Sequence, residues 1–336
     1  MKKFFFFILA TMIAVNAFGY EKQSWNYETG VKLSTDAPGV HALDIYYPET
    51  GEAPYPVLIY VGASAWQNPN YKTFAYNEAS AFLEYALQHG YAVVCPNNRI
   101  PKEASYPASL HDIKAVVRFL HNNGEWDSNP RDIDTSFIAV SGFNDGSYMA
   151  MHMGLTRNKQ IVSWESWEGN VGNFTGKSSS VDAVVDFQCQ IALYCEDPSW
   201  IGCPSCTTQQ LWYKQLFAVN DFKDIAPTMI VSGKQQAIIP AADIAEVVRL
   251  MKENLKLGDD CEYYEYKGAF GIPTDNVSHE AIMNFFDRIR AKKQAQGIES
   301  PSLQGRSGEA SKFIQDGQLL ILRGDKTFNA IGTQVK

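Results

Sequence analysis

The sequence lacks the features of several protein classes. After the first 19 residues, no stretch approaches the ~20 consecutive apolar residues that a membrane-spanning helix needs, so we expect no membrane span. The formal net charge is −8 and no basic run occurs beyond residues 288–293, which argues against nucleic acid as a partner. No nucleotide-binding loop or other cofactor fingerprint is present, so we expect no cofactor.

Cysteine is scarce and mostly confined to one segment. Of six cysteines, four lie close together: Cys189, Cys195, Cys203 and Cys206. Cys203-Pro-Ser-Cys206 has the spacing of zinc ligands, but a second Cys-x-x-Cys pair is missing. Disulfide bonds within this segment are therefore the favoured expectation, and no metal site is predicted. Cys95 and Cys261 lie in apolar strand patterns and are predicted to be buried core residues.

The two ends of the chain differ in composition from its middle. Residues 1–19 place two lysines before an apolar block, the pattern of a secretory signal peptide, so we expect export to the periplasm, the cell surface or the medium. Residues 20–292 suit one large domain. Residues 293–311 are polar and predict a linker, and hairpin signals in 312–336 predict a short β tail. No sequence pattern predicts the oligomeric state.

Strands and helices alternate through the middle of the chain. Strands are predicted at 56–61, 91–95, 137–140, 181–187, 227–232 and 263–266. Helices are predicted at 71–89, 112–122, 241–255 and 279–289. Alternating residues at 25–33 and 41–47 predict an edge hairpin, and 188–222 is a lid-like excursion without a clear period. The fold class is therefore α/β, with a mostly parallel, doubly wound sheet that has antiparallel strands at its start.

Residues 135–150, TSFIAVSGFNDGSYMA, are the centre of this pattern. A β-branched strand enters the turn Gly142-Phe143-Asn144-Asp145-Gly146 and leaves as a helix of small residues. This is the layout of a nucleophile elbow, in which two glycines let the backbone hold a strained central residue at the mouth of a parallel sheet. The central residue is Asn144, whose amide is a very poor nucleophile.

Four segments in their order resemble the α/β-hydrolase superfamily and, more narrowly, the exported acetyl-xylan/feruloyl esterase-like carboxylesterases of gut Bacteroidetes. They are IYVGASAW (59–66), NNRIPKEASYPASLHDIKAVVRFL (97–120), DIDTSFIAVSGFNDGSYMA (132–150) and GNVGNFTGKSSSVDAVVDF (169–187). The resemblance covers about residues 56–289 and implies an α/β-hydrolase fold with a triad in the chain order Ser, Asp, His. The tail resembles, more weakly, a C-terminal β tail of exported Bacteroidales-type proteins, which suggests sorting or surface display.

All three triad positions that the resemblance assigns are replaced. Asn144 stands for the nucleophile, Gln236 for the acid and Phe270 for the base. Because the loss of all three leaves no acyl-enzyme route, the resemblance implies an inactive or strongly impaired carboxylesterase whose pocket binds acylated plant polysaccharide or a related ester. Backbone N–H groups of Ser64, Ala65 and Asp145 remain candidates to bind a ligand oxygen.

A second hypothesis is that the protein is an active esterase with relocated catalytic residues. Ser141 or Ser147 would act with His279 in an active serine esterase on carbohydrate esters. Against it, Ser141 is expected in the strand before the elbow and Ser147 on the first helical turn, neither at the apex. His279 is expected at the start of the last helix, either on the surface or turned back toward the pocket. The two hypotheses differ in whether a serine, a histidine and a carboxylate converge near Asn144.

Overall fold

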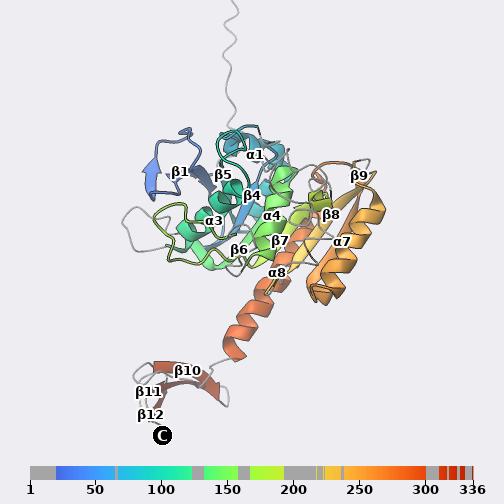
Figure 1. The fold of residues 1–336 in the computed structure, drawn as a ribbon. Helices are drawn as coiled ribbons and strands as arrows, with labels where there is room; N and C mark the ends of the chain where they lie inside the picture. The colour runs from blue at the N-terminus through green and yellow to red at the C-terminus, as the bar shows by residue number, and fades with distance from the viewer. Residues whose placement is uncertain are drawn as a thin grey trace, which may run out of the picture.

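The computed structural model describes two separate β-sheets (Figure 1). The nine-stranded sheet has the order β2-β1-β3-β5-β4-β6-β7-β8-β9, and the three-stranded sheet has the order β10-β11-β12. The expected signal peptide lies outside the described residues. The structure describes residues 20–64, 67–122, 132–157, 167–192, 217, 222, 224–235, 238–299, 310–315, 318–323, 326–329 and 335.

The chain starts with an antiparallel meander of β1 (Lys22–Asn26), β2 (Val31–Leu33) and β3 (Ala42–Tyr46), in which β1 pairs with both neighbours. The sequence predicted a hairpin of two longer strands. A turn that ends at Gly30, with φ of 75°, divides the first of them. Every residue of β3 is buried, because β3 also pairs with β5 and so lies inside the sheet.

The rest of the large sheet is parallel, as the alternating pattern predicted. Its strands are β4 (Tyr55–Val61), β5 (Ala92–Pro96), β6 (Ile133–Phe143), β7 (Ala183–Phe187), β8 (Thr228–Gln235) and β9 (Cys261–Ala269). Continuous apolar runs form most of these strands because helices cover both faces of the sheet. All six strands end at one edge, which brings the loops after β4, β6, β7, β8 and β9 together.

Helices form a layer on each face of the sheet. One face packs against α3 (Ala108–His121), α4 (Asp145–Leu155) and α7 (Ala241–Glu253). The other packs against α1 (Lys72–Glu78), α2 (Ser80–Gln88) and α8 (Asn276–Glu299). Successive residues of β6 contribute to opposite layers, with Val140 in the first and Ala139 in the second. No helix in the described ranges is both long and apolar enough to span a membrane.

The last helix is longer than predicted. The sequence placed its end at residue 289 and a linker from 293, whereas α8 continues to Glu299 and leads toward the small sheet (Figure 1). Alanine, lysine and glutamine dominate this extension and favour helix. The small sheet is an antiparallel meander of β10 (Ala310–Gln315), β11 (Gln318–Arg323) and β12 (Lys326–Asn329), consistent with the hairpin signals.

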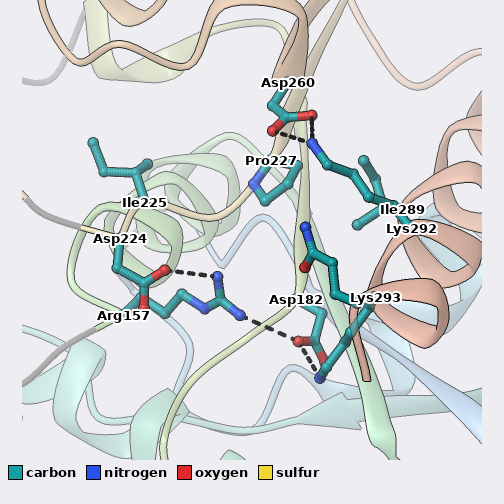
Figure 2. A pocket seen from close by; sticks show the side chains of 10 residues that line it. Arg157, Asp182, Asp224, Ile225, Pro227, Asp260, Ile289, Lys292 and Lys293 are labelled. Atoms are coloured by element: carbon teal, nitrogen blue, oxygen red, sulfur yellow. Dashed lines mark hydrogen bonds and ion pairs between the residues drawn. The ribbon is translucent and has the colours of Figure 1, made fainter. Parts of the chain in front are cut away.

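Ion pairs attach the basic segment of α8, residues 288–293, to the edge of the sheet opposite the elbow. Lys292 lies 2.8 Å from Asp260, and Lys293 lies 2.5 Å from Asp182. A cavity of about 230 Å³ opens beside these pairs (Figure 2). Arg157 lines it between Asp182 and Asp224. The basic run noted in the sequence is therefore engaged with carboxylates of its own chain.

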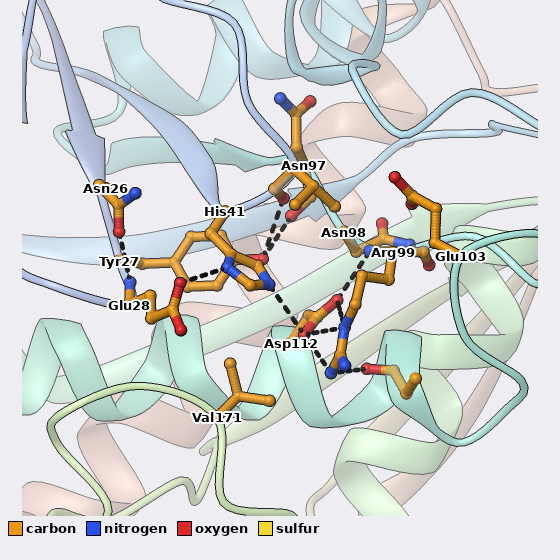
Figure 3. A network of polar contacts seen from close by, with 12 residues as sticks. Asn26, Tyr27, Glu28, His41, Asn97, Asn98, Arg99, Glu103, Asp112 and Val171 are labelled. Carbon is orange, nitrogen blue, oxygen red and sulfur yellow. Dashed lines mark hydrogen bonds and ion pairs between the residues drawn. The ribbon is translucent and has the colours of Figure 1, made fainter.

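A polar network joins the N-terminal meander to α3 near the end of β5 (Figure 3). His41 Nδ1 lies 2.6 Å from Glu28 Oε2, and His41 Nε2 lies 3.7 Å from Asp112 Oδ1. Arg99 Nη2 lies 2.8 Å from the same carboxylate. Burial raises the pKa of Asp112, and the hydrogen bonds from Arg99 oppose that rise. The network fixes the loop after β5, which belongs to one of the four segments that carry the family resemblance.

Candidate functional site

Asn144 lies at the apex of a sharp turn between β6 and α4. Its backbone has φ of 56° and ψ of −124°, a strained conformation for a residue other than glycine. The flanking glycines are required sterically. A Cβ on Gly146 would lie 1.9 Å from the Val61 carbonyl oxygen, and one on Gly142 would lie 2.3 Å from Gly146. The strand, strained residue and helix have the arrangement of a nucleophile elbow.

Asn144 is half-buried. Its backbone carbonyl accepts the Tyr148 N–H over 3.2 Å, as expected for the first turn of α4. Its amide does not cap the helix, and it makes no hydrogen bond with any residue that the structure describes. A primary amide in this position offers two N–H donors and a carbonyl acceptor. The apex therefore has hydrogen-bonding capacity in place of a nucleophile.

Phe270, predicted to stand at the position of the base, directly follows β9. Its ring is half-buried, and its centroid lies 5.2 Å from that of Phe143, the residue before the apex. The loop around Phe270 is held by Tyr266, whose hydroxyl donates to the Ala269 and Gly271 carbonyl oxygens over 2.7 and 3.0 Å. Gln236, predicted to stand at the acid position, lies outside the described residues. An aromatic pair thus joins the residue before the apex to the loop after β9.

Gln188 connects the end of β7 to β8, to β9 and to the loop after β9. Its Nε2 donates to Tyr266 Oη over 3.0 Å and also to the Gly271 carbonyl oxygen. Its Oε1 accepts the Gly233 N–H over 3.4 Å. Gln188 and Cys189 both have positive φ, 79° and 55°. In the sequence, Gln188 is marked only by its place directly after a strand that ends at the ligand edge.

The N–H groups of Ala63 and Ser64, in the loop after β4, donate hydrogen bonds to acceptors within the protein. The Ser64 N–H donates to the Gly62 carbonyl oxygen over 3.0 Å, and the Ala63 N–H donates to Glu78 Oε1 over 3.2 Å. The Ser64 hydroxyl donates to the buried carboxylate of Asp145. Ser64, predicted to offer its N–H to a ligand oxygen, thus uses it within the loop. Ala65 lies outside the described residues.

Glu78 is a second residue that the sequence analysis missed. It also accepts hydrogen bonds from the Tyr60 and Tyr71 hydroxyls, over 2.5 and 3.0 Å. Burial raises the pKa of Glu78, and these hydrogen bonds together with the Ala63 N–H oppose the rise. In the sequence Glu78 is one polar residue of an expected helix. Only the folding of α1 against the loop after β4 brings it to the site.

Ser147 and Asp186 form a buried pair beneath the elbow. The Ser147 hydroxyl donates to Asp186, which also accepts the Cys189 N–H over 3.0 Å. Both side chains are fully buried, and burial raises the pKa of Asp186 to about 7. Ser141 is fully buried in β6, and its hydroxyl has no hydrogen-bond partner in the described ranges. Neither serine reaches the solvent-facing side of the elbow.

His279 is buried in the helix layer on the other side of the sheet from Ser147. Its Nε2 lies 2.8 Å from the Pro273 carbonyl oxygen, and its ring packs against Phe82 and Tyr85 of α2. Burial lowers its pKa. The expectation of a surface or pocket residue at His279 is therefore not met. Ser141 faces the same layer, but no hydrogen bond joins it to His279. Ser147 lies on α4, across the sheet.

The cysteine expectation requires a correction. Cys189 is a free thiol, fully buried in the core with Ile191 and Cys261, so it does not take part in a disulfide bond. Cys195, Cys203 and Cys206 lie outside the described residues. Cys95 and Cys261 are buried free thiols, as their strand patterns predicted. Among the residues that the structure describes, no group of three or more histidine, cysteine or acidic side chains is arranged to hold a metal ion.

The chain is similar to known esterases. The profile of the BD-FAE family matches residues 43–250. A solved truncated carbohydrate esterase from gut microbiota is 24% identical, with a TM-score of 0.66 over 80% of this chain and 96% of that one. A bifunctional GH43-CE protein of Bacteroides eggerthii is 25% identical, with a TM-score of 0.61 over 79% of this chain and 38% of that one. No curated protein matches.

More distant neighbours share the same fold. Esterase B of Lactobacillus rhamnosis, solved with a tributyrin phosphonate inhibitor, is 17% identical, with a TM-score of 0.60 over 83% of this chain and 89% of that one. The sheet order, the elbow at Asn144 and a profile match over more than half of the chain agree with one another. The chain belongs to the BD-FAE family of α/β-hydrolase-type esterases.

Proposed function

We propose that this protein is an exported, non-catalytic member of its family, in which the pocket at the elbow binds a carbohydrate or a related ester. The observation that carries the proposal is Asn144, an amide held at the apex of an elbow whose backbone geometry is intact. A strained turn that keeps its shape without its nucleophile favours a retained binding role over simple decay.

The other two triad positions support the same proposal. Phe270 has no group that accepts a proton, and Gln236 cannot stabilise a positively charged imidazole as a carboxylate does. In a serine protease, removal of the serine or the histidine alone lowers kcat by about 10⁶-fold. With all three groups replaced, no acyl-enzyme route remains through the family's own positions.

The alternative of an active esterase with relocated residues has no specific observation in its favour. Ser141 and Ser147 are both fully buried, so an ester carbonyl does not reach either hydroxyl in this conformation. Ser147 hydrogen-bonds to Asp186 and lies on the opposite face of the sheet from His279. A carbohydrate ligand is preferred because the first two solved neighbours are a carbohydrate esterase and a GH43-CE protein.

The test is turnover by the purified protein without residues 1–19. We expect no hydrolysis of p-nitrophenyl acetate above the uncatalysed rate and no labelling by a fluorophosphonate probe. Turnover that disappears in Ser147→Ala, Ser141→Ala or His279→Ala would overturn the proposal in favour of the active alternative. Export is tested separately, by N-terminal sequencing of the protein recovered from outside the cytoplasm, which should begin near Tyr20.

A further inference from the structure

The mouth of the former active site combines an available amide with an aromatic pair. Asn144 is half-buried, and its amide is free of hydrogen bonds to the described residues. Phe143 precedes it in the chain, and the Phe270 ring lies 5.2 Å from the Phe143 ring at an angle of 51°. Both rings are half-buried, so each keeps an accessible part. Two of the three groups, Asn144 and Phe270, stand at triad positions.

This combination fits a neutral sugar ring. A primary amide presents donors and an acceptor side by side, which matches two neighbouring hydroxyl groups of one sugar. An aromatic surface beside the amide can pack against the apolar C–H face of the same ring. The nearby carboxylates give no reason to expect a cation, because Asp145 is fully buried against Ser64 and Glu78 accepts three hydrogen bonds.

Two described N–H groups of the loop after β4, those of Ala63 and Ser64, are already engaged within the protein. In a working esterase, N–H groups of this loop bind the carbonyl oxygen as it becomes negatively charged. Here the Ala63 N–H donates to Glu78 and the Ser64 N–H donates to Gly62. A ligand carbonyl would compete with both acceptors. The Asn144 amide makes no hydrogen bond with the described residues, and its donors and acceptor suit a hydroxyl group, which can both accept and donate.

We propose that the former catalytic centre is a binding subsite for a neutral sugar with two adjacent free hydroxyl groups, that is, for deacylated rather than acylated carbohydrate. Asn144 binds the two hydroxyls, and Phe143 and Phe270 pack against the ring. This inference rests on the proposed function and names the ligand class of the same pocket. Acetylation of either hydroxyl removes a donor and adds bulk where the amide must approach, so it weakens binding.

The test is calorimetric titration with neutral β-1,4-linked tetrasaccharides of xylose, mannose and glucose, each in free and in O-acetylated form. We expect the wild type to bind at least one free tetrasaccharide, and its acetylated form at least tenfold more weakly. Asn144→Gly removes the amide while relieving the strained φ, and Phe270→Leu removes the aromatic face while keeping apolar bulk. Each variant should weaken Kd at least tenfold, whereas Asn254→Ala, an exposed amide at the end of α7, should leave it unchanged.

Several outcomes would overturn the inference. They are equal or tighter binding of the acetylated sugar, a Kd within twofold of wild type for Asn144→Gly with the thermal midpoint preserved, and absence of binding to all the free tetrasaccharides. Acetate release is measured in the same titrations. Release by the wild type would count against the proposed function itself, whereas a wrong binding preference without release would count only against the ligand class.

Discussion

Asp186 shows how one buried residue sets a pH dependence. Its pKa is raised from 3.8 to about 7 by burial, and hydrogen bonds from Ser147 and the Cys189 N–H only partly oppose this rise. Between pH 3.8 and about pH 7, Asp186 holds a proton in the folded protein that it has released in the unfolded chain. The stability from this group is therefore complete below about pH 4 and is lost as the pH rises through 7.

We predict that Asp186→Asn stabilises the protein at pH 8 and changes little at pH 4. Asparagine keeps an acceptor for Ser147 and Cys189 but carries no charge to bury. The full rise in pKa corresponds to at most about 4 kcal/mol, so a gain of up to roughly 8 to 16 °C in the thermal midpoint at pH 8 is expected. Asp259→Asn, an exposed carboxylate, is the control. An equal shift at both pH values would contradict the prediction.

His152 produces the opposite dependence. It is fully buried among the rings of Tyr106, Tyr148 and Trp167, and neither ring nitrogen has a hydrogen-bond partner in the described ranges. Burial lowers its pKa from 6.5 to about 3, and the nearby charge of Lys114 adds to this effect. The unfolded chain thus takes up a proton that the folded protein excludes. Stability from this group is lost as the pH falls below about 6.5.

For His152→Phe we therefore expect a smaller fall in thermal midpoint between pH 7 and pH 4 than in the wild type. Phenylalanine fills the same aromatic surroundings and has no site for a proton. His89→Phe is the control. Because His89 is exposed, its replacement should leave the pH dependence of the thermal midpoint unaltered. Parallel pH curves for wild type and His152→Phe would show that another group controls the loss of stability in acid.

At the scale of elements, the elbow depends on close contact between α4 and the end of β4. A Cβ at Gly146 would lie 1.9 Å from the Val61 carbonyl oxygen and 2.6 Å from its carbon, both backbone atoms that cannot move alone. Gly176 provides a matched contrast, since a Cβ there meets no atom within 4 Å and the residue is exposed. The first glycine is required by packing and the second is not.

We predict that Gly146→Ala destabilises the protein by more than about 3 kcal/mol or prevents folding, because α4 must shift away from β4. Gly176→Ala should change the free energy of unfolding by less than about 1 kcal/mol. Urea denaturation of the two variants measures the difference. Similar midpoints for both would mean that the contact between α4 and β4 relaxes without cost.

Element boundaries show what sequence patterns miss. Apolar runs located the parallel strands because burial on both faces leaves a continuous signal, as in 56–61. The end of α8 was predicted too early because its polar extension is held by Asp260 and Asp182, which are distant in the chain. Glu78 and Gln188 could not be assigned to the site for the same reason. Their roles depend on which loops the sheet order brings together, whereas the elbow at Asn144 is marked by local glycine spacing.

At the scale of the whole molecule, the two sheets are separate structures. Strands β10, β11 and β12 pair only with one another, and none joins the nine-stranded sheet. We therefore predict that a chain ending at Glu299 keeps its thermal midpoint within about 2 °C of the full-length protein. Calorimetry of the two forms is the measurement. A fall of more than about 5 °C would show that the tail contributes to the stability of the large domain.

The course of α8 also determines on which side of the domain the tail lies relative to the elbow. The helix begins after β9, at the sheet edge that carries Asn144, and its 24 residues extend about 36 Å. Ion pairs of Lys292 with Asp260 and of Lys293 with Asp182 hold the helix at the opposite edge, and its last turns project beyond the domain (Figure 1). The tail therefore leaves the domain on the side away from the elbow. A molecule held by its C-terminal strands would present the elbow outward, away from the point of attachment.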